Sequence, residues 1–95
     1  MRAAALVPFL KANVALVEGA VERTAADIDA GTYPGVVDNL AMEAEGIEHI
    51  VHAAEHRGLD ATALRGVLTA ARRAVDLGHG ADTWTSTIEG IRNPA

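Results

Sequence analysis

Apolar residues in the N-terminal third of the chain recur at steps of three and four, which is the spacing of one side of an α-helix. They are Leu6, Leu10, Val14, Val17, Val21, Ala25 and Ile28. Charged residues such as Glu18 and Glu22 fall mostly on other sides. Pro8 is tolerated only in or near a first turn, because deeper in a helix it costs about 3 kcal/mol. The pattern predicts a long helix that begins close to Pro8, or an earlier helix kinked there.

The sequence AGTYPG at positions 30–35 ends this helix. Gly31 can take the left-handed conformation of a C-terminal cap, and Pro34 keeps the residue before it out of the helical region. A second helix is predicted from about Val36 to His56, ended by Gly58. Its inner side consists of Val36, Leu40, Ala44, Ile47, Val51 and Ala54.

Two further helices follow. Asp60 is a good N-cap for a third helix, which Gly78–Gly80 breaks. A short last helix is predicted to begin at Asp82 or Thr83 and to end before Asn93-Pro94. The apolar sides of these helices are Leu64, Val67, Leu68, Ala71 and Val75, and then Trp84, Ile88 and Ile91. Because no stretch alternates apolar and polar residues, we expect no sheet. The predicted fold is an all-α, four-helix domain with short connections and one long N-terminal helix.

A chain of 95 residues forms one domain, residues 1–95, and buries only about 60–65% of its unfolded surface, so association would stabilise it. The net charge of −5 argues against binding to nucleic acid. The absence of cysteine fits a reducing, cytoplasmic setting. The N-terminal stretch carries Pro8, Lys11, Asn13 and Glu18, and its helical pattern continues past them. We therefore expect neither a membrane span nor a secretion signal.

The sequence HAAEH, from His52 to His56, matches the H-x-x-E-H pattern of inverted zinc peptidases. Such an enzyme also needs a third ligand from a distant element and a cleft for an extended substrate. The favoured interpretation is that these residues lie opposite the apolar side of their helix and face water. No metal site is assigned, and His52 and His56 remain weak candidates for adventitious zinc or nickel. His79 is interpreted as a loop residue. No phosphate-binding loop or nucleophile elbow occurs.

Three segments carry a resemblance to a known family. They are Ile28-Asp29-x-Gly31-x-Tyr33-Pro34-Gly35, the sequence GLDATAL at positions 58–64, and GHGAD at positions 78–82 followed by Ile88-Glu89-x-Ile91-Arg92. With these segments, nearly the whole chain resembles the C-terminal helical domain of NADPH-dependent imine reductases and reductive aminases. That family belongs to the 6-phosphogluconate and β-hydroxyacid dehydrogenase group.

The resemblance implies a division of labour between two domains. In this family an N-terminal Rossmann domain binds NADPH, a long helix that usually carries an Asp or Tyr proton donor follows it, and two C-terminal domains embrace in a reciprocal dimer. The chain is therefore expected to form an intertwined homodimer and one wall of an imine-binding cleft. We expect it to bind no cofactor and to be inactive by itself, because the Rossmann half and the long connecting helix are absent from these residues. No catalytic or cofactor-binding residue is assigned.

Within that resemblance Met42 and, less strongly, Phe9 are predicted to line the substrate cleft, with ordinary core packing as the alternative for both. Two other functions stay open. The chain could be a free-standing helical module that binds a small amine, an apolar ligand or a partner nucleotide-binding domain. The HAAEH sequence leaves a metal-binding hydrolase as the third.

Overall fold

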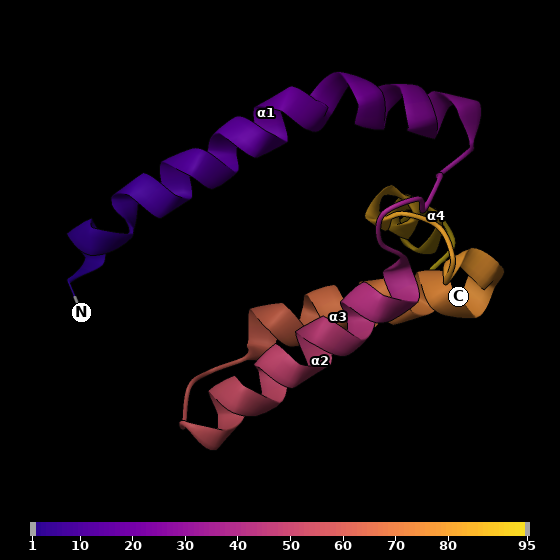
Figure 1. Cartoon of the computed structure of the whole chain (residues 1–95). Helices are drawn as coiled ribbons and strands as arrows, with labels where there is room; N and C mark the ends of the chain where they lie inside the picture. Colours follow the sequence, from indigo (N-terminus) through magenta and orange to yellow (C-terminus); the bar gives the residue numbers. More distant parts are fainter. Residues whose placement is uncertain (1, 95) are drawn as a thin grey trace.

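The computed structural model describes residues 2–94, which form an all-α fold without a strand among them. Figure 1 shows four α-helices: α1 (Val7–Ala30), α2 (Leu40–His56), α3 (Thr62–Ala74) and α4 (Thr87–Arg92). Three shorter helical segments, η1 (Ala3–Leu6), η2 (Val75–His79) and η3 (Trp84–Ser86), complete the chain. The predicted helical fold with one long N-terminal helix is confirmed.

The start of α1 is compatible with Pro8, because proline is tolerated in the first turn of a helix. Pro8 lies in its first turn, and Gly31, with φ of 67°, forms a left-handed C-terminal cap. Gly31 N–H donates to the Ile28 carbonyl at 3.2 Å, and Thr32 N–H donates to the Asp27 carbonyl at 3.2 Å. The helix therefore ends in the capped turn that the sequence predicts.

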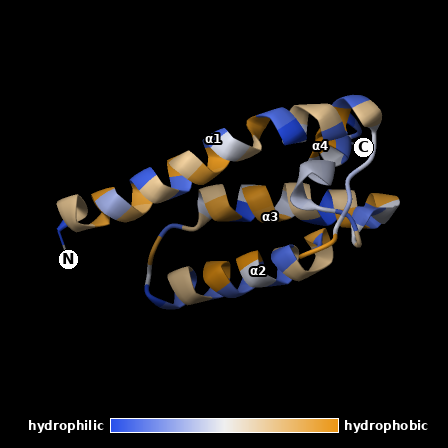
Figure 2. Ribbon diagram, turned by 45° about the horizontal axis from the view of Figure 1, so that its top comes forward, coloured by the Kyte–Doolittle hydropathy of each residue, from blue (hydrophilic) through white to orange (hydrophobic). Residues whose placement is uncertain are grey.

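Helices α2, α3 and α4 form a compact body, and most of α1 is separated from it (Figure 1). No residue of α1 is buried, and α1 contacts the body mainly through η3. In Figure 2, hydrophobic residues recur along the whole of α1 although no helix of this chain covers them. The stretch Ala3–Ala30 is long and apolar enough to cross a membrane by length and composition, a test that a signal sequence or the core helix of a soluble protein also passes.

The core lies between α2 and α3, which run side by side (Figure 2). Its buried residues are Leu40, Ala44, Leu68, Ala71 and Ala74, with Ile47, Val75 and Trp84 packed against them. Three alanines in this set let the helices approach closely. Gly90 serves the same purpose between α4 and α3, because a Cβ there would lie 3.2 Å from the Ala70 carbonyl oxygen.

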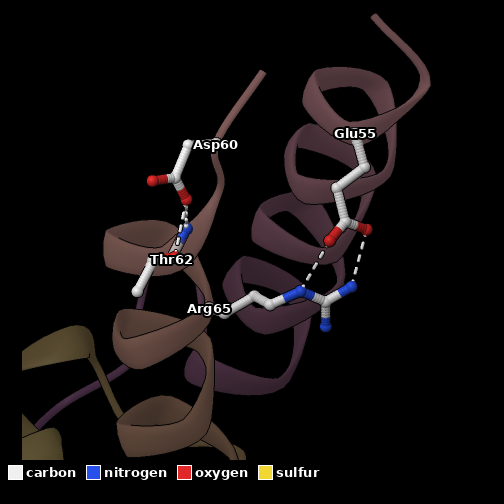
Figure 3. Close-up of polar contacts among 4 residues, drawn as sticks. All are labelled: Glu55, Asp60, Thr62 and Arg65. Carbon is white, nitrogen blue, oxygen red and sulfur yellow. Dashed lines mark hydrogen bonds and ion pairs between the residues drawn. The ribbon is translucent and has the colours of Figure 1, made fainter. Parts of the chain in front are cut away.

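The predicted start of the second helix was four residues too early. Helix α2 begins at Leu40, and the Asn39 side chain caps it by accepting a hydrogen bond from Met42 N–H at 2.9 Å. Val36 is 88% exposed and does not belong to the inner side. The third helix begins at Thr62, and its N-cap residue is Ala61, one position after the predicted Asp60. Asp60 Oδ1 accepts hydrogen bonds from Thr62 N–H at 2.9 Å and from Thr62 Oγ1 at 2.6 Å, so its side chain still binds the first residue of the helix (Figure 3).

The glycines at 78 and 80 break the third helix as predicted. Helix α3 continues into the π-turn of η2, and Gly78 then takes φ of 102°, a left-handed conformation that interrupts the helix. The last helical segment begins at Trp84 of η3, with Thr83 as its N-cap, as predicted, and becomes α-helical from Thr87. Ile91, on the apolar side of this helix, is 63% exposed, so the described residues do not cover that end of the apolar side.

Candidate functional site

A cleft of about 350 Å³ opens where α1 meets the body. One wall is the C-terminal half of α1, and the second is the connection that precedes α2. The third wall is formed by Thr83, the N-cap residue of η3, and Thr85 within η3. The lining residues are Ala20, Arg23, Thr24, Asp27, Pro34, Val36, Val37, Asp38, Thr83 and Thr85. The cleft thus combines one guanidinium, two carboxylates and three hydroxyls with an apolar floor.

The apolar part of this lining is unusually accessible. Val36 is 88% exposed and Val37 is 94% exposed. Burial of these two neighbouring apolar side chains against another surface would gain favourable transfer free energy. The connection at Val36-Val37 is therefore a candidate contact surface as well as a cleft wall.

Glu43 lies one turn into α2, close to the connection. Its Oε1 atom is buried, and no described residue donates a hydrogen bond to it. Burial, together with the nearby negative charge of Asp38, raises the pKa of the Glu43 carboxyl above its usual value. An acid in this state holds its proton more tightly than an exposed glutamate does.

The structure places both predicted substrate-lining residues on the surface. Met42 is 54% exposed on the first turn of α2, and Phe9 is 68% exposed on the first turn of α1. Core packing within this chain therefore does not account for either residue. Neither side chain lines the cleft between α1 and the body. No sequence motif marks that cleft, because residues far apart in the chain form it.

The carboxylates around the HAAEH sequence pair with arginines. Figure 3 shows Glu55, the fourth residue of the motif, bound by Arg65 of α3, which donates from Nε and Nη2 at 2.7 and 2.6 Å. Arg72 lies about two turns further along α3 than Arg65. It pairs with Glu48 and lowers the pKa of the Glu48 carboxyl. His52 and His56 are exposed. Within residues 2–94, no three His, Cys, Asp or Glu side chains are grouped so that they could hold a metal ion.

His79 has a partner that sequence reasoning missed. Its Nδ1 atom lies 2.8 Å from Asp82 Oδ2, and its ring packs edge-on against Tyr33 with centroids 5.9 Å apart. The three-residue spacing within GHGAD was the available signal, since a His and an Asp on one turn can reach each other.

Comparison with known proteins places this architecture. The family described as NADPH-dependent reductive aminase-like, C-terminal domain, matches residues 1–93. An imine reductase from Bacillus cereus is 34% identical, with a TM-score of 0.88, over 98% of this chain and 32% of its own. The Streptomyces aurantiacus imine reductase is 36% identical, with a TM-score of 0.83, over 96% of this chain and 31% of its own.

A reductive aminase from Aspergillus terreus, solved with NADPH and ethyl levulinate, shares the fold. Its TM-score is 0.86 at 24% identity, over 96% of this chain and 32% of its own. No curated relative matches the chain. The 95 residues span about a third of the length of these solved enzymes. From the match over residues 1–93, the chain belongs to the family of C-terminal domains of NADPH-dependent reductive aminase-like proteins.

Proposed function

We propose that this chain is the dimerisation and substrate-cleft domain of an NADPH-dependent, imine reductase-like oxidoreductase, and that it is not catalytic by itself. Family membership supports the class of enzyme. The observation that carries the dimerisation role is the uncovered apolar surface of α1. An isolated domain of this size has little stability to spare, and covering that surface would supply some.

Seven large apolar residues of α1 are between 43% and 73% exposed: Val7, Phe9, Leu10, Val14, Leu16, Val17 and Val21. An apolar surface of this extent on one element marks an interaction site. A second copy is the simplest cover, because one surface on both partners satisfies a twofold interface. The exposed Val36-Val37 connection lies beside the cleft at the root of α1 and would extend the same interface.

The same helix meets the length and hydropathy test for a membrane span. Two observations favour a protein partner instead. The solved imine reductases match 98% and 96% of this chain, so a counterpart of α1 is part of their fold. Lys11 and Glu18 also interrupt the apolar stretch, and charged side chains are costly within a bilayer. A cytoplasmic location is part of this proposal.

The chemistry requires a second domain. Reduction of an imine needs hydride from a bound nicotinamide, and these 95 residues contain no G-x-G-x-x-G dinucleotide motif. In the proposed enzyme, NADPH binds to a Rossmann domain, and the helical domain supplies the facing wall of the cleft for a small imine or amine. Met42 and Phe9 are the proposed contacts on that wall. Their exposure supports the role, since both are available to a ligand or partner.

Size-exclusion chromatography with light scattering tests the dimerisation role. At tens of micromolar we expect the mass of a dimer, and a stable monomer would contradict the proposal. Calorimetric titration with NADPH tests the division of labour. No heat of binding is expected from this chain alone, whereas binding at micromolar concentration would show that the helical domain holds the cofactor itself.

The mixed charges of the cleft support one alternative, a free-standing module that binds a small amine. Asp27 and Asp38 would attract the ammonium group, and the valine wall would contact its apolar part. Amide NMR spectra recorded with and without cyclohexylamine distinguish the two functions. A monomer whose cleft resonances shift saturably would favour the module, and a dimer without such shifts would favour the enzyme domain.

A further inference from the structure

We propose that the segment Gly78–Thr83, here called the bracket, fixes the angle between α1 and the body through its contacts with Tyr33. That angle in turn sets the width of the cleft. Tyr33 acts in this proposal as a positioning residue for α1. The consequence for pairing with a second copy rests on the proposed function, whereas the angle of α1 within one chain does not.

Within one chain, few contacts other than those at Tyr33 constrain the orientation of α1. None of its residues is buried, and its contacts with the body lie mainly at η3, near its C-terminal end. Figure 1 shows the rest of the helix separated from the body as it extends towards the N-terminus. Within one copy, the contacts that can set the direction of so long an element therefore lie at its base, where residues 31–39 connect it to α2.

Tyr33 is the anchored residue of that connection. Its side chain is buried, and its hydroxyl donates a hydrogen bond to Glu89 Oε1 of α4 at 3.2 Å. The Tyr33 carbonyl accepts from Thr83 N–H at 3.0 Å, and His79 packs its ring edge-on against the phenol. The backbone, the hydroxyl and the ring of Tyr33 thus each have a partner. The bracket contacts the backbone and the ring, and α4 binds the hydroxyl.

The bracket is in turn fastened to the body. His79 Nδ1 lies 2.8 Å from Asp82 Oδ2, which closes the turn. The Asp82 carbonyl accepts from Leu40 N–H at 2.8 Å, and the Gly80 carbonyl accepts from Ala41 N–H at 3.0 Å. These two carbonyls satisfy donors in the first turn of α2 that have no partner within the helix. The bracket therefore connects the base of α1 to the start of α2.

Gly35 shows how tightly the connection lies against the bracket. A Cβ at this position would lie only 2.2 Å from the Ala81 carbonyl oxygen and 3.1 Å from the Asp38 carbonyl oxygen. Both are backbone atoms, so they can move only if the connection or the bracket moves. Glycine at this position permits the close approach, and any side chain would push the two segments apart.

Small changes at the bracket are amplified along α1. Lys11 lies about 28 Å from Ala30 along the helix axis, at 1.5 Å per residue. A rotation of about 10° at the base would therefore move Lys11 by about 5 Å. A displacement of that size would change the cleft and the position of the apolar surface offered to a second copy.

Distance measurement between two spin labels tests the proposal. The chain contains no cysteine, so Lys11→Cys and Ala63→Cys give one label on α1 and one on α3, both at exposed positions. Dilution with unlabelled chain restricts the signal to distances within one copy. We expect one narrow distance peak in the parent, a broad distribution in Tyr33→Ala, and a displaced or broadened peak in Gly35→Ala. Tyr33→Phe should broaden the peak less, because it keeps the ring and the carbonyl contacts.

Glu55→Gln is the matched control, since it weakens a polar contact at the far end of the α2–α3 pair and should leave the peak unchanged. Circular dichroism checks that the body stays helical. An unchanged narrow peak in Tyr33→Ala and Gly35→Ala would overturn the proposal, as would a broad peak in the parent. Loss of helical signal in both variants would also overturn it, because the bracket would then belong to the core of the body. A monomer with a narrow peak would contradict the proposed dimer and leave the bracket intact.

Discussion

Tyr33 is the only tyrosine in the chain, and its surroundings disfavour the phenolate. Burial, followed by the hydrogen bond to Glu89 and the negative charge of that carboxylate, raises the Tyr33 pKa above its ordinary value of 10.0. A group whose pKa is raised on folding stabilises the fold fully below its unfolded pKa, and that stabilisation is lost as the pH rises through the folded pKa.

We therefore expect the free energy of unfolding to fall as the pH rises above about 10, and to fall less steeply in Tyr33→Phe. At neutral pH the same variant should lose about 1 kcal/mol with its hydrogen bond. Urea unfolding across the alkaline range measures both effects. Because one tyrosine is present, the absorbance of its phenolate reports the Tyr33 titration directly. A titration midpoint at the value of free tyrosine would contradict the buried position.

The pKa of Glu43 is also raised on folding, so its ionisation likewise lowers the free energy of unfolding, here in the acidic range. Its folded pKa is raised by burial and then by Asp38, so ionisation at neutral pH works against folding. Glu43→Gln keeps the shape and removes the charge. We expect the variant to be more stable than the parent at pH 7, and the difference to shrink towards zero as the pH falls below the unfolded Glu pKa. Thermal melts at the two pH values test this. Greater stability of the parent at pH 7 would mean that the ionised carboxylate has a cationic partner in solution.

At the scale of elements, the small residues between helices decide the packing. Gly90 of α4 faces backbone atoms of α3, and a Cβ there would lie 3.2 Å from both the Ala70 carbonyl oxygen and the Ala74 nitrogen. In a free helix, replacing glycine with alanine stabilises by about 0.5–1 kcal/mol. We expect Gly90→Ala to reverse that sign and destabilise by about 1–3 kcal/mol, because α4 must move away from α3.

Gly46 provides the control for this prediction. It lies within α2, is exposed, and a Cβ there would have no neighbour within 4 Å. Gly46→Ala should therefore stabilise by about 0.5–1 kcal/mol. Chemical denaturation of both variants gives the comparison. A stabilising Gly90→Ala would show that the α3–α4 contact is looser than described.

The ends of the helices show what a periodic pattern can and cannot predict. Gly31 and Pro34 imposed the end of α1 locally, so its position was predictable from the sequence. Val36 fitted the spacing of the next helix, but Asn39 provides the side-chain cap and the helix begins after it. Periodicity identifies a face and carries little information on where that face begins. The break at Gly78 was predictable in the same local way, because glycine readily takes the positive φ found there. The π-turn of η2 that precedes this break has no simple sequence pattern.

At the scale of the whole molecule, the candidate cleft was not predictable from the sequence. Met42 and Phe9 were named from family resemblance; both are exposed and neither lines the cleft, so their role stays a prediction. The cleft at the base of α1 was not predicted, because Arg23, Val37 and Thr83 meet only once the fold is formed. The pairing of His79 with Tyr33 arises in the same way, from segments far apart in the sequence.

The arrangement of α1 makes one further prediction, which concerns association. Leu10, Val14, Val17 and Val21 recur on one row of the helix, whereas Lys11, Glu18 and Glu22 recur on a neighbouring row together with Ala15. If a second copy covers the apolar row, Val17→Glu buries a charge twice in each symmetric dimer. We expect its dissociation constant to rise by at least about 100-fold, which corresponds to about 2.8 kcal/mol.

Ala15→Glu introduces the same charge into the same helix on the row that already carries charges, and it should leave association nearly unchanged. Sedimentation equilibrium of the parent and both variants measures the difference, and circular dichroism shows whether α1 stays helical. Equal weakening by the two substitutions would mean that added charge, rather than the apolar row, controls association. Equal and undiminished association of all three proteins would place the interface elsewhere, and the exposed Val36-Val37 connection would then be the next surface to test.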